Sequence, residues 1–351
     1  MPSRTVLITG ANGYIGNAVC RAFVRAGWTT YGLIRSERSA ISLAAEEVLP
    51  VIGNIDDISS HGVIKSKLSS ELHAIISTTE DIKDYIPHYN NTIRLLRTLS
   101  ESSTAGRTRP LVIFTSGCKD YGVGPHFAND AGLKPHTEES LINPPALLKN
   151  RATYSQKIFD HTDVFDPVLV RPTNVYGRSS SYYLAFFKIA AQTAATKDKP
   201  LVIPVRKDSI CHALHVDDCG DAYVAIAAHH QREEVVGQAF NISSHRYETV
   251  EDIAESLINE YGIAAGVKYV DDRELAPGEN PWPMAIVDFP QWTGSEKLRK
   301  VTSWKDRRLL FSEAIHVYRV AYEANDAVGH DDIARTEDKF DVFHLAVKRS
   351  A

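Results

Sequence analysis

The segment that most constrains the fold is a glycine-rich loop that directly follows a β-branched, apolar run. Residues 4–9 read Arg-Thr-Val-Leu-Ile-Thr, and residues 9–16 read Thr-Gly-Ala-Asn-Gly-Tyr-Ile-Gly. The apolar run is typical of a strand that is covered on both faces. Residues 17–26 then carry apolar residues at helical spacing and are followed by Gly27, a stop signal for a helix. The order is therefore strand, tight loop and helix.

Each glycine of this loop has a physical task. Gly10 permits the tight turn, Gly13 lets the backbone approach a pyrophosphate, and Gly16 lets the helix pack close to the strand. The free N–H groups at the helix start then face the phosphates. The candidate cofactor-binding residues of the loop are Gly10, Asn12, Gly13, Tyr14, Ile15 and Gly16.

Strand-like and helix-like segments alternate through the first half of the chain, which indicates crossover units and a parallel sheet. After Pro172 longer helical stretches alternate with short strands. The predicted fold class is α/β, a Rossmann-type doubly wound parallel sheet with a smaller C-terminal α/β substrate lobe. We predict strands at 29–34, 48–52, 74–77, 110–115 and 166–171, helices at 90–100 and 147–161, then helices at 182–195, 216–229, 250–261 and 311–322 with strands at 201–204, 238–242 and 267–270.

The expected domain boundaries follow this change. Residues 1–177 form the dinucleotide-binding domain, which also receives segments around 205–245. Residues 178–325 form mainly the substrate lobe, with an irregular loop at 277–290. Residues 326–351 are a polar tail, which is either a docked helix or partly disordered.

Composition excludes several classes of protein. The 351 residues are 43% hydrophobic and 24% charged, as in an average globular protein. A net charge of −5 leaves no basic surplus for nucleic acid, and no apolar run reaches the roughly 18 residues of a membrane span. The four cysteines are scattered, which suggests a reducing compartment. We expect a cytoplasmic monomer or homodimer with a small-molecule substrate and no metal.

Three further motifs stand in a recognisable order after the loop. Residues 169–177 read Leu-Val-Arg-Pro-Thr-Asn-Val-Tyr-Gly, residues 214–218 read Leu-His-Val-Asp-Asp, and residues 237–242 read Gly-Gln-Ala-Phe-Asn-Ile. With the TGxxGxxG loop, this order resembles the extended, epimerase/dehydratase-like branch of the short-chain dehydrogenase/reductase superfamily. The resemblance spans the chain up to residue 242 and implies an enzyme that uses a nicotinamide dinucleotide.

The end of the second strand indicates which dinucleotide. NAD-preferring enzymes place an acid there to bind the ribose 2′-hydroxyl, whereas this chain has Arg35, whose guanidinium suits a 2′-phosphate. We therefore predict NADP, with NAD the alternative. The resemblance adds cofactor positions after the third, fourth and sixth strands, at Asn54, Ile55, Ser77, Thr78, Pro172 and Asn174.

The catalytic positions depart from the family pattern. The resemblance implies a hydroxyl after the fifth strand, but its slot falls on Gly117, with Thr115 and Ser116 beside it. It also implies a tyrosine as proton donor and a lysine four residues later that holds the cofactor ribose. Counting back from Arg171 places that lysine at Lys149, which doubles as a cofactor ligand and a catalytic candidate.

The tyrosine slot then falls on Pro145, so two substitutes stay open as proton donors. Tyr154 precedes Lys157 by three residues, and Tyr121 follows the fifth strand in a loop over the site. Either one, or neither, supplies the proton.

The substrate side also departs from the nucleotide-sugar enzymes of this branch, which grip a diphosphate with arginines. Cys211 and Ala276 occupy the two arginine slots, and Arg206 and Arg273 are shifted from them. The Asp217-Asp218 pair is expected to cap a helix. Pocket candidates are Asn174, Tyr176, His212 and Trp282.

The sequence thus predicts an NADP(H)-dependent oxidoreductase of the atypical extended type, acting on a small or hydrophobic carbonyl or alcohol. Two alternatives stay open. One is an epimerase or dehydratase that uses bound NAD(P) internally, and the other is a non-catalytic NADP-binding regulatory protein.

Overall fold

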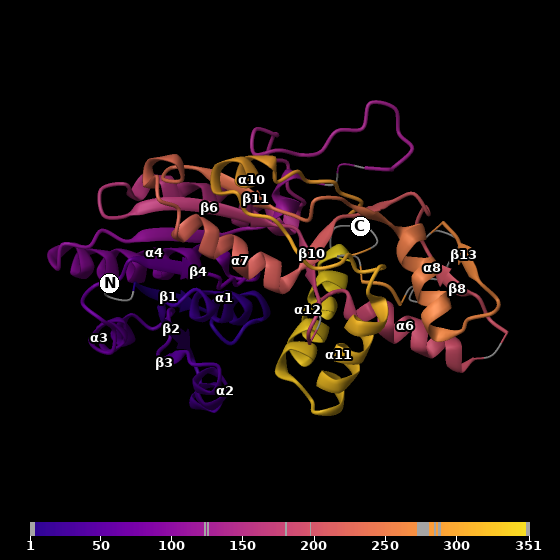
Figure 1. Ribbon diagram of the computed structural model, residues 1–351, viewed down its shortest axis with the longest axis horizontal. Coiled ribbons are helices and arrows are strands. Elements are labelled where there is room, and N and C mark those ends of the chain that lie inside the picture. The colour runs from indigo at the N-terminus through magenta and orange to yellow at the C-terminus, as the bar shows by residue number, and fades with distance from the viewer. Residues whose placement is uncertain are drawn as a thin grey trace.

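A parallel sheet forms the centre of the protein. The computed structural model describes residues 4–348 except 123, 125, 180, 197, 272–280, 284–285 and 287–288. The strands of the sheet are β1 (Thr5–Thr9), β2 (Thr29–Ile34), β3 (Leu49–Ile52), β4 (Ala74–Ser77), β5 (Leu111–Thr115), β6 (Asp166–Pro172) and β11 (Ala239–Ile242). These seven strands lie in the order β11-β6-β5-β4-β1-β2-β3, and every pairing is parallel (Figure 1). The predicted doubly wound α/β class is confirmed.

Helices cover both faces of this sheet. The buried side chains of each strand point alternately to one helix layer and to the other. On β1, Val6 and Ile8 pack into the cluster that contains α1 and α7, whereas Leu7 packs into the cluster on the α4 side. Both faces therefore exclude water, which explains the continuous apolar runs of the strands. The helices of the two layers are α1 (Tyr14–Arg25), α2 (Ala40–Ala45) and α7 (Val216–Ala227) on one side, and α3 (His61–Ser66), α4 (Tyr85–Ala105) and α5 (Lys149–Ser155) on the other.

A third apolar cluster holds the C-terminal lobe together. Tyr176, Tyr183 and Phe311 are fully buried, and the rings of Tyr183 and Phe311 meet edge to face at 4.8 Å. The helices around this cluster are α6 (Leu184–Ala195), α8 (Val250–Tyr261), α11 (Ile315–Ala327) and α12 (Asp331–Lys348), with short strands β7 (Asn174–Tyr176), β8 (Leu201–Ile203), β9 (Ile210–Cys211), β10 (Ala213–His215), β12 (Glu248–Thr249) and β13 (Val267–Tyr269).

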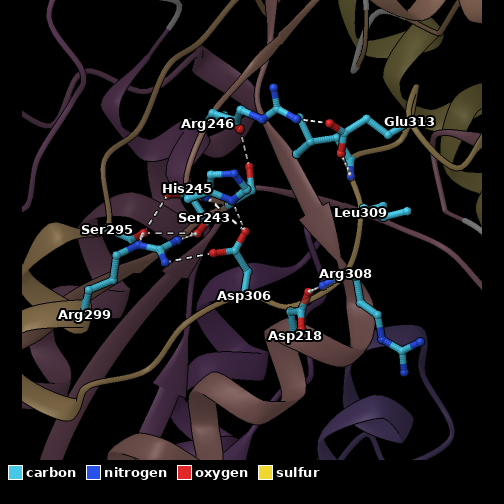
Figure 2. A network of polar contacts seen from close by, with 12 residues as sticks. Asp218, Ser243, His245, Arg246, Ser295, Arg299, Asp306, Arg308, Leu309 and Glu313 are labelled. Carbon is cyan, nitrogen blue, oxygen red and sulfur yellow. Dashed lines mark hydrogen bonds and ion pairs between the residues drawn. The ribbon is translucent and has the colours of Figure 1, made fainter.

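A polar network ties the segment before α11 to the exit of β11 and to α7 (Figure 2). Asp306 is buried, accepts hydrogen bonds from the backbone N–H and the ring of His245, and pairs with Arg299 at 2.8 Å. Asp218 accepts from the backbone N–H of Arg308 at 2.9 Å. Arg299 lies on α10 (Glu296–Thr302), a helix that the sequence analysis did not predict. These bonds fix the lobe to the carboxyl end of the sheet.

The prediction that the acid pair Asp217-Asp218 caps α7 is wrong. His215, not the acid pair, is the N-cap residue, and its Nδ1 accepts from the backbone N–H of Asp217 at 3.1 Å. Asp217 instead binds Arg178 at 2.7 Å and Arg21 at 3.2 Å. Burial alone would raise the pKa of Asp217, but its bonds to Arg178 and the other nearby cations hold that pKa well below its ordinary value.

Two helical predictions also differ from the structure. The helix expected at 147–161 is regular only over α5 and continues as a 3-10 turn from Gln156 to His161. The tail, left open between helix and disorder, contains α12. Most of the predicted loop at 277–290 lies outside the described residues. Among the described helices, none is long and apolar enough to cross a membrane.

The contact between α1 and α7 yields a test of the packing. A Cβ on Gly220 would lie 2.6 Å from the carbonyl oxygen of Ala18, so Gly220→Ala should push the helices apart and destabilise the protein by about 1–3 kcal/mol, the usual cost of overpacking. Urea unfolding measures the change. Gly62→Ala is the matched control, because Gly62 also lies in a helix and has open space around its Cβ position. Equal effects of the two substitutions would contradict this account.

Candidate active site

The glycine loop forms an anion cradle at the start of α1. Gly10 has a φ of +66°, and its carbonyl accepts from the N–H of Gly13 at 2.8 Å. A Cβ on Gly16 would collide with that same carbonyl, so only glycine lets α1 approach β1 this closely. Gly13 is the N-cap residue of α1. Because glycine has no side chain, it cannot accept a hydrogen bond from the first-turn N–H groups as a capping serine or aspartate would. A dinucleotide pyrophosphate fits this cradle.

The end of β2 lies beside the loop. The Asn12 side chain donates to Ser39 Oγ at 3.1 Å, which ties the loop to the turn after β2. Arg35 is exposed at the end of this strand, and we find no ion pair for it within the described part of the chain. Arg35 thus lies at the strand end beside which Rossmann-type proteins bind the ribose of a dinucleotide.

The ends of β3 and β4 lie at the same edge of the sheet. Asn54 is exposed and accepts from the backbone N–H of Asp56 at 3.1 Å, whereas Ile55 is buried. Thr78 donates to the carbonyl of Thr9 at 2.6 Å and so braces the loop. Ser77 is buried, and its hydroxyl has no hydrogen-bond partner among the described residues.

The exit of β6 runs toward the lobe. Pro172 ends β6 opposite Ile242 of β11, and Asn174 starts β7, where it is half-buried. The other pocket candidates lie in the interior: Tyr176 donates to the carbonyl of Leu309, and Trp282 donates to that of Val202.

A buried ion pair lies where the family pattern implies the catalytic hydroxyl. Asp120 is fully buried and accepts from Arg151 Nε at 2.9 Å and from Arg151 Nη2 at 2.7 Å. Ser116 donates its hydroxyl to the other oxygen of Asp120 at 2.5 Å. The Arg151 guanidinium also lies 3.4 Å from the position of a Cβ on Gly117, so it borders the empty hydroxyl slot. We call Ser116, Asp120 and Arg151, with Glu80 at 3.4 Å from Arg151, the Asp120 cluster.

Electrostatics keep Arg151 charged in this position. Burial alone would lower the pKa of Arg151, but the carboxylates of Asp120 and Glu80 hold it above its ordinary value. The guanidinium is therefore a permanent cation that cannot deliver a proton, and its effect on a bound substrate is electrostatic.

The structure separates the two tyrosine candidates from this cluster. Tyr121 is buried, donates to Asn241 Oδ1 at 2.7 Å and stacks on His136, and burial raises its pKa above the ordinary range. The ring of Tyr154 packs edge to face on Tyr89 at 5.5 Å, on the α4 side of the sheet.

The remaining catalytic candidates are also spread out. Thr115 Oγ1 lies 2.9 Å from the hydroxyl of Tyr223 on α7. Lys149 is exposed at the start of α5, two positions before Arg151. Ser116 is thus the one residue of the predicted catalytic set that lies in the Asp120 cluster.

Sequence reasoning missed Asp120, Arg151 and Glu80. For Asp120 the sequence signal was an acid in the segment that follows a buried strand. For Arg151 it was an arginine close to the expected lysine. Neither charge is expected at a buried position unless it is paired.

Taken together, the doubly wound sheet and its glycine cradle define a Rossmann-type dinucleotide-binding protein. The chain belongs to the NAD dependent epimerase/dehydratase family, which it matches over residues 6–243. The resemblance inferred from the motifs is confirmed, and the members of this family are NAD-dependent enzymes.

One known protein resembles the chain over most of its length, and another resembles it over a short segment. UDP-glucose 4-epimerase of Azospirillum brasilense is 24% identical over 319 residues, which are 86% of this chain and 87% of that protein. An uncharacterized protein of Schizosaccharomyces pombe is 40% identical over only 53 residues, which are 15% of this chain and 18% of that protein.

Solved structures share the fold. The UDP-Glc/GlcNAc 4-epimerase of Campylobacter jejuni superposes with a TM-score of 0.67 at 19% identity, covering 93% of this chain and 100% of that chain. The dTDP-glucose 4,6-dehydratase of Bacillus anthracis, solved with NAD, has a TM-score of 0.67 at 18% identity, covering 93% and 98%.

The Asp120 cluster can be tested through stability. Arg151→Ala should destabilise the protein by about 3 kcal/mol, because it leaves the buried Asp120 carboxylate without its closest cation. Urea unfolding measures this loss. Arg97→Ala is the control. It removes a solvent-exposed ion pair with Asp163 and should change the urea midpoint little. Arg151→Lys, which keeps a cation beside Asp120, should lose less than Arg151→Ala; an equal loss would show that the charge of Arg151 is not what stabilises the cluster.

Proposed function

We propose that this protein is an NADP(H)-dependent oxidoreductase that acts on a small or hydrophobic carbonyl or alcohol. The observation that carries the cofactor choice is the exposed Arg35 at the end of β2. A carboxylate at this position would repel a 2′-phosphate, whereas a guanidinium binds it by charge-assisted hydrogen bonds.

The lobe supports a substrate without a diphosphate. Cys211, in one of the arginine slots of the nucleotide-sugar enzymes, is buried in the apolar cluster of the lobe. The nearby Arg206 binds Asp208 at 2.7 Å and stacks over the ring of Phe127. Its charge is therefore already engaged. The other slot, Ala276, and the shifted Arg273 lie outside the described residues.

The Asp120 cluster suggests how the reacting oxygen is held. When bound, the nicotinamide dinucleotide supplies or accepts the hydride. A carbonyl oxygen that enters the space beside Gly117 meets the Arg151 guanidinium, whose N–H groups stabilise developing negative charge. The Ser116 hydroxyl donates its hydrogen bond to Asp120, so the Ser116 oxygen can orient a neighbouring substrate hydroxyl by accepting a hydrogen bond from it. In this proposal water, instead of a phenol, gives the proton that the alkoxide needs after hydride addition, and water takes up that proton when the alcohol is oxidised.

A second candidate is an epimerase or dehydratase that keeps NAD(P) bound and returns the hydride to the same substrate. The similarity to a UDP-glucose 4-epimerase over most of both chains favours it. A panel of aldehydes and ketones distinguishes the two. Net consumption of NADPH supports the oxidoreductase, whereas dinucleotide that copurifies and is not consumed supports the epimerase or dehydratase.

Arg35→Ala tests the cofactor assignment. We expect the Kd of NADPH to rise about tenfold or more, the worth of one charge-assisted hydrogen bond, and the Kd of NADH to stay unchanged. Titration calorimetry on the purified protein measures both values. Arg25→Ala is the control, because Arg25 is also exposed but lies at the far end of α1, paired with Asp221. An unaltered NADPH-to-NADH ratio in Arg35→Ala would remove the 2′-phosphate assignment.

A further inference from the structure

The C-terminal helix α12 lies between the two parts of the molecule. Figure 1 shows it next to α11, between α1 of the nucleotide-binding part and α6 of the lobe. Its attachment to the lobe is well packed: Ile333 and Thr336 are buried, Asp332 accepts from Ser179 Oγ at 2.9 Å, and Glu337 pairs with Lys188 of α6. The helix therefore belongs to the lobe.

One side chain of α12 reaches the glycine loop. Arg335 Nη2 donates to the backbone carbonyl of Asn12 at 2.7 Å, across 323 residues of sequence. The same atom donates to Asp332 Oδ1 at 2.7 Å. Asn12 directly precedes Gly13, the N-cap of α1, and its own side chain binds Ser39 at the end of β2. A second link joins Asp331 to Arg38 at 3.5 Å on the surface.

The charge of Arg335 is the informative feature. The N-terminus of α1 carries positive partial charge and is built to receive an anion. A helix that blocked this site in place of a dinucleotide would present an acid to it, because only an anion imitates a phosphate. The residue presented is a cation, which binds a neutral carbonyl of the loop and Asp332 of its own helix. A phosphate oxygen is a stronger acceptor for this guanidinium than a carbonyl is.

We propose that α12 is a clasp for the dinucleotide, in which Arg335 binds a cofactor phosphate over the glycine loop. This rests on the proposed function only in requiring that a nicotinamide dinucleotide binds the cradle. The Arg335 side chain is 41% exposed and both of the hydrogen bonds described above leave from one nitrogen, so its other N–H groups are open to a phosphate. Asp332 holds the side chain in place before the cofactor arrives.

The first test is the affinity of the full-length protein for NADPH and NADH. Arg335→Ala should raise the Kd about tenfold, measured by calorimetry, without lowering the melting temperature. A loss for both dinucleotides assigns Arg335 to the pyrophosphate, and a loss for NADPH alone assigns it to the 2′-phosphate; either supports the clasp. An unchanged or lower Kd overturns it, and a lower Kd would mean that α12 obstructs the site.

Lys188→Ala is the matched control, since it removes a cation that touches α12 from the lobe side and leaves Arg335 in place. It should not change either Kd. A loss equal to that of Arg335→Ala would mean that docking of the helix, not the guanidinium, is what the cofactor needs, and would overturn the proposal.

Hydrogen exchange on the wild-type chain gives a readout without any substitution. Saturating NADPH should slow exchange of the amides at 331–340, and faster exchange there would overturn the clasp. Different results decide the proposed function and the clasp. If the wild type binds a dinucleotide but reduces no carbonyl, or prefers NADH, the oxidoreductase proposal falls and the clasp stands. If the wild type binds neither dinucleotide, both fall.

Discussion

The close approach of α1 to β1 on one side and to α7 on the other is the constraint on which the rest of the structure depends. Two missing side chains make it possible, at Gly16 against the Gly10 carbonyl and at Gly220 against the Ala18 carbonyl. With α1 held there, its first-turn N–H groups open onto the carboxyl edge of the sheet. The ends of β2 and β4 then bring Arg35 and Thr78 to the same edge, so a packing requirement and a binding requirement are met by one geometry.

The Asp120 cluster is the second organising feature, and its chemistry differs from that of the family pattern. A phenol paired with a lysine transfers a proton, and its efficiency depends on a pKa near the working pH. An arginine held between Asp120 and Glu80 stays protonated, so it acts only by its field and its hydrogen bonds. Removing either the Asp120 carboxylate or the Arg151 guanidinium alone would leave the other buried charge without its closest partner.

Much of the fold could be predicted, because β-branched apolar runs indicate buried strands and glycines indicate where helices end. The predicted strands at 29–34 and 74–77 and the helix at 250–261 coincide with β2, β4 and α8. The site was harder. Spacing cannot tell which way a side chain turns in the 3-10 turn after β5, where Asp120 faces Arg151 and Tyr121 faces Asn241. The tail was also undecided, since its sequence is polar and its helix is held by contacts with the lobe, such as that of Ile333.

The clasp gives the polar tail a physical reason to be ordered. If Arg335 binds a cofactor phosphate while Ile333 and Asp332 stay packed on the lobe, the dinucleotide touches both parts of the molecule. Binding of the cofactor and the position of the lobe are then linked by a single free energy, and this coupling is reciprocal. A substrate held by the lobe would strengthen the grip on the dinucleotide as much as the dinucleotide strengthens the grip on the substrate. In the reaction that we propose, Arg151 only stabilises charge, so the reacting oxygen must be held against its guanidinium, and this coupling would help to hold it there.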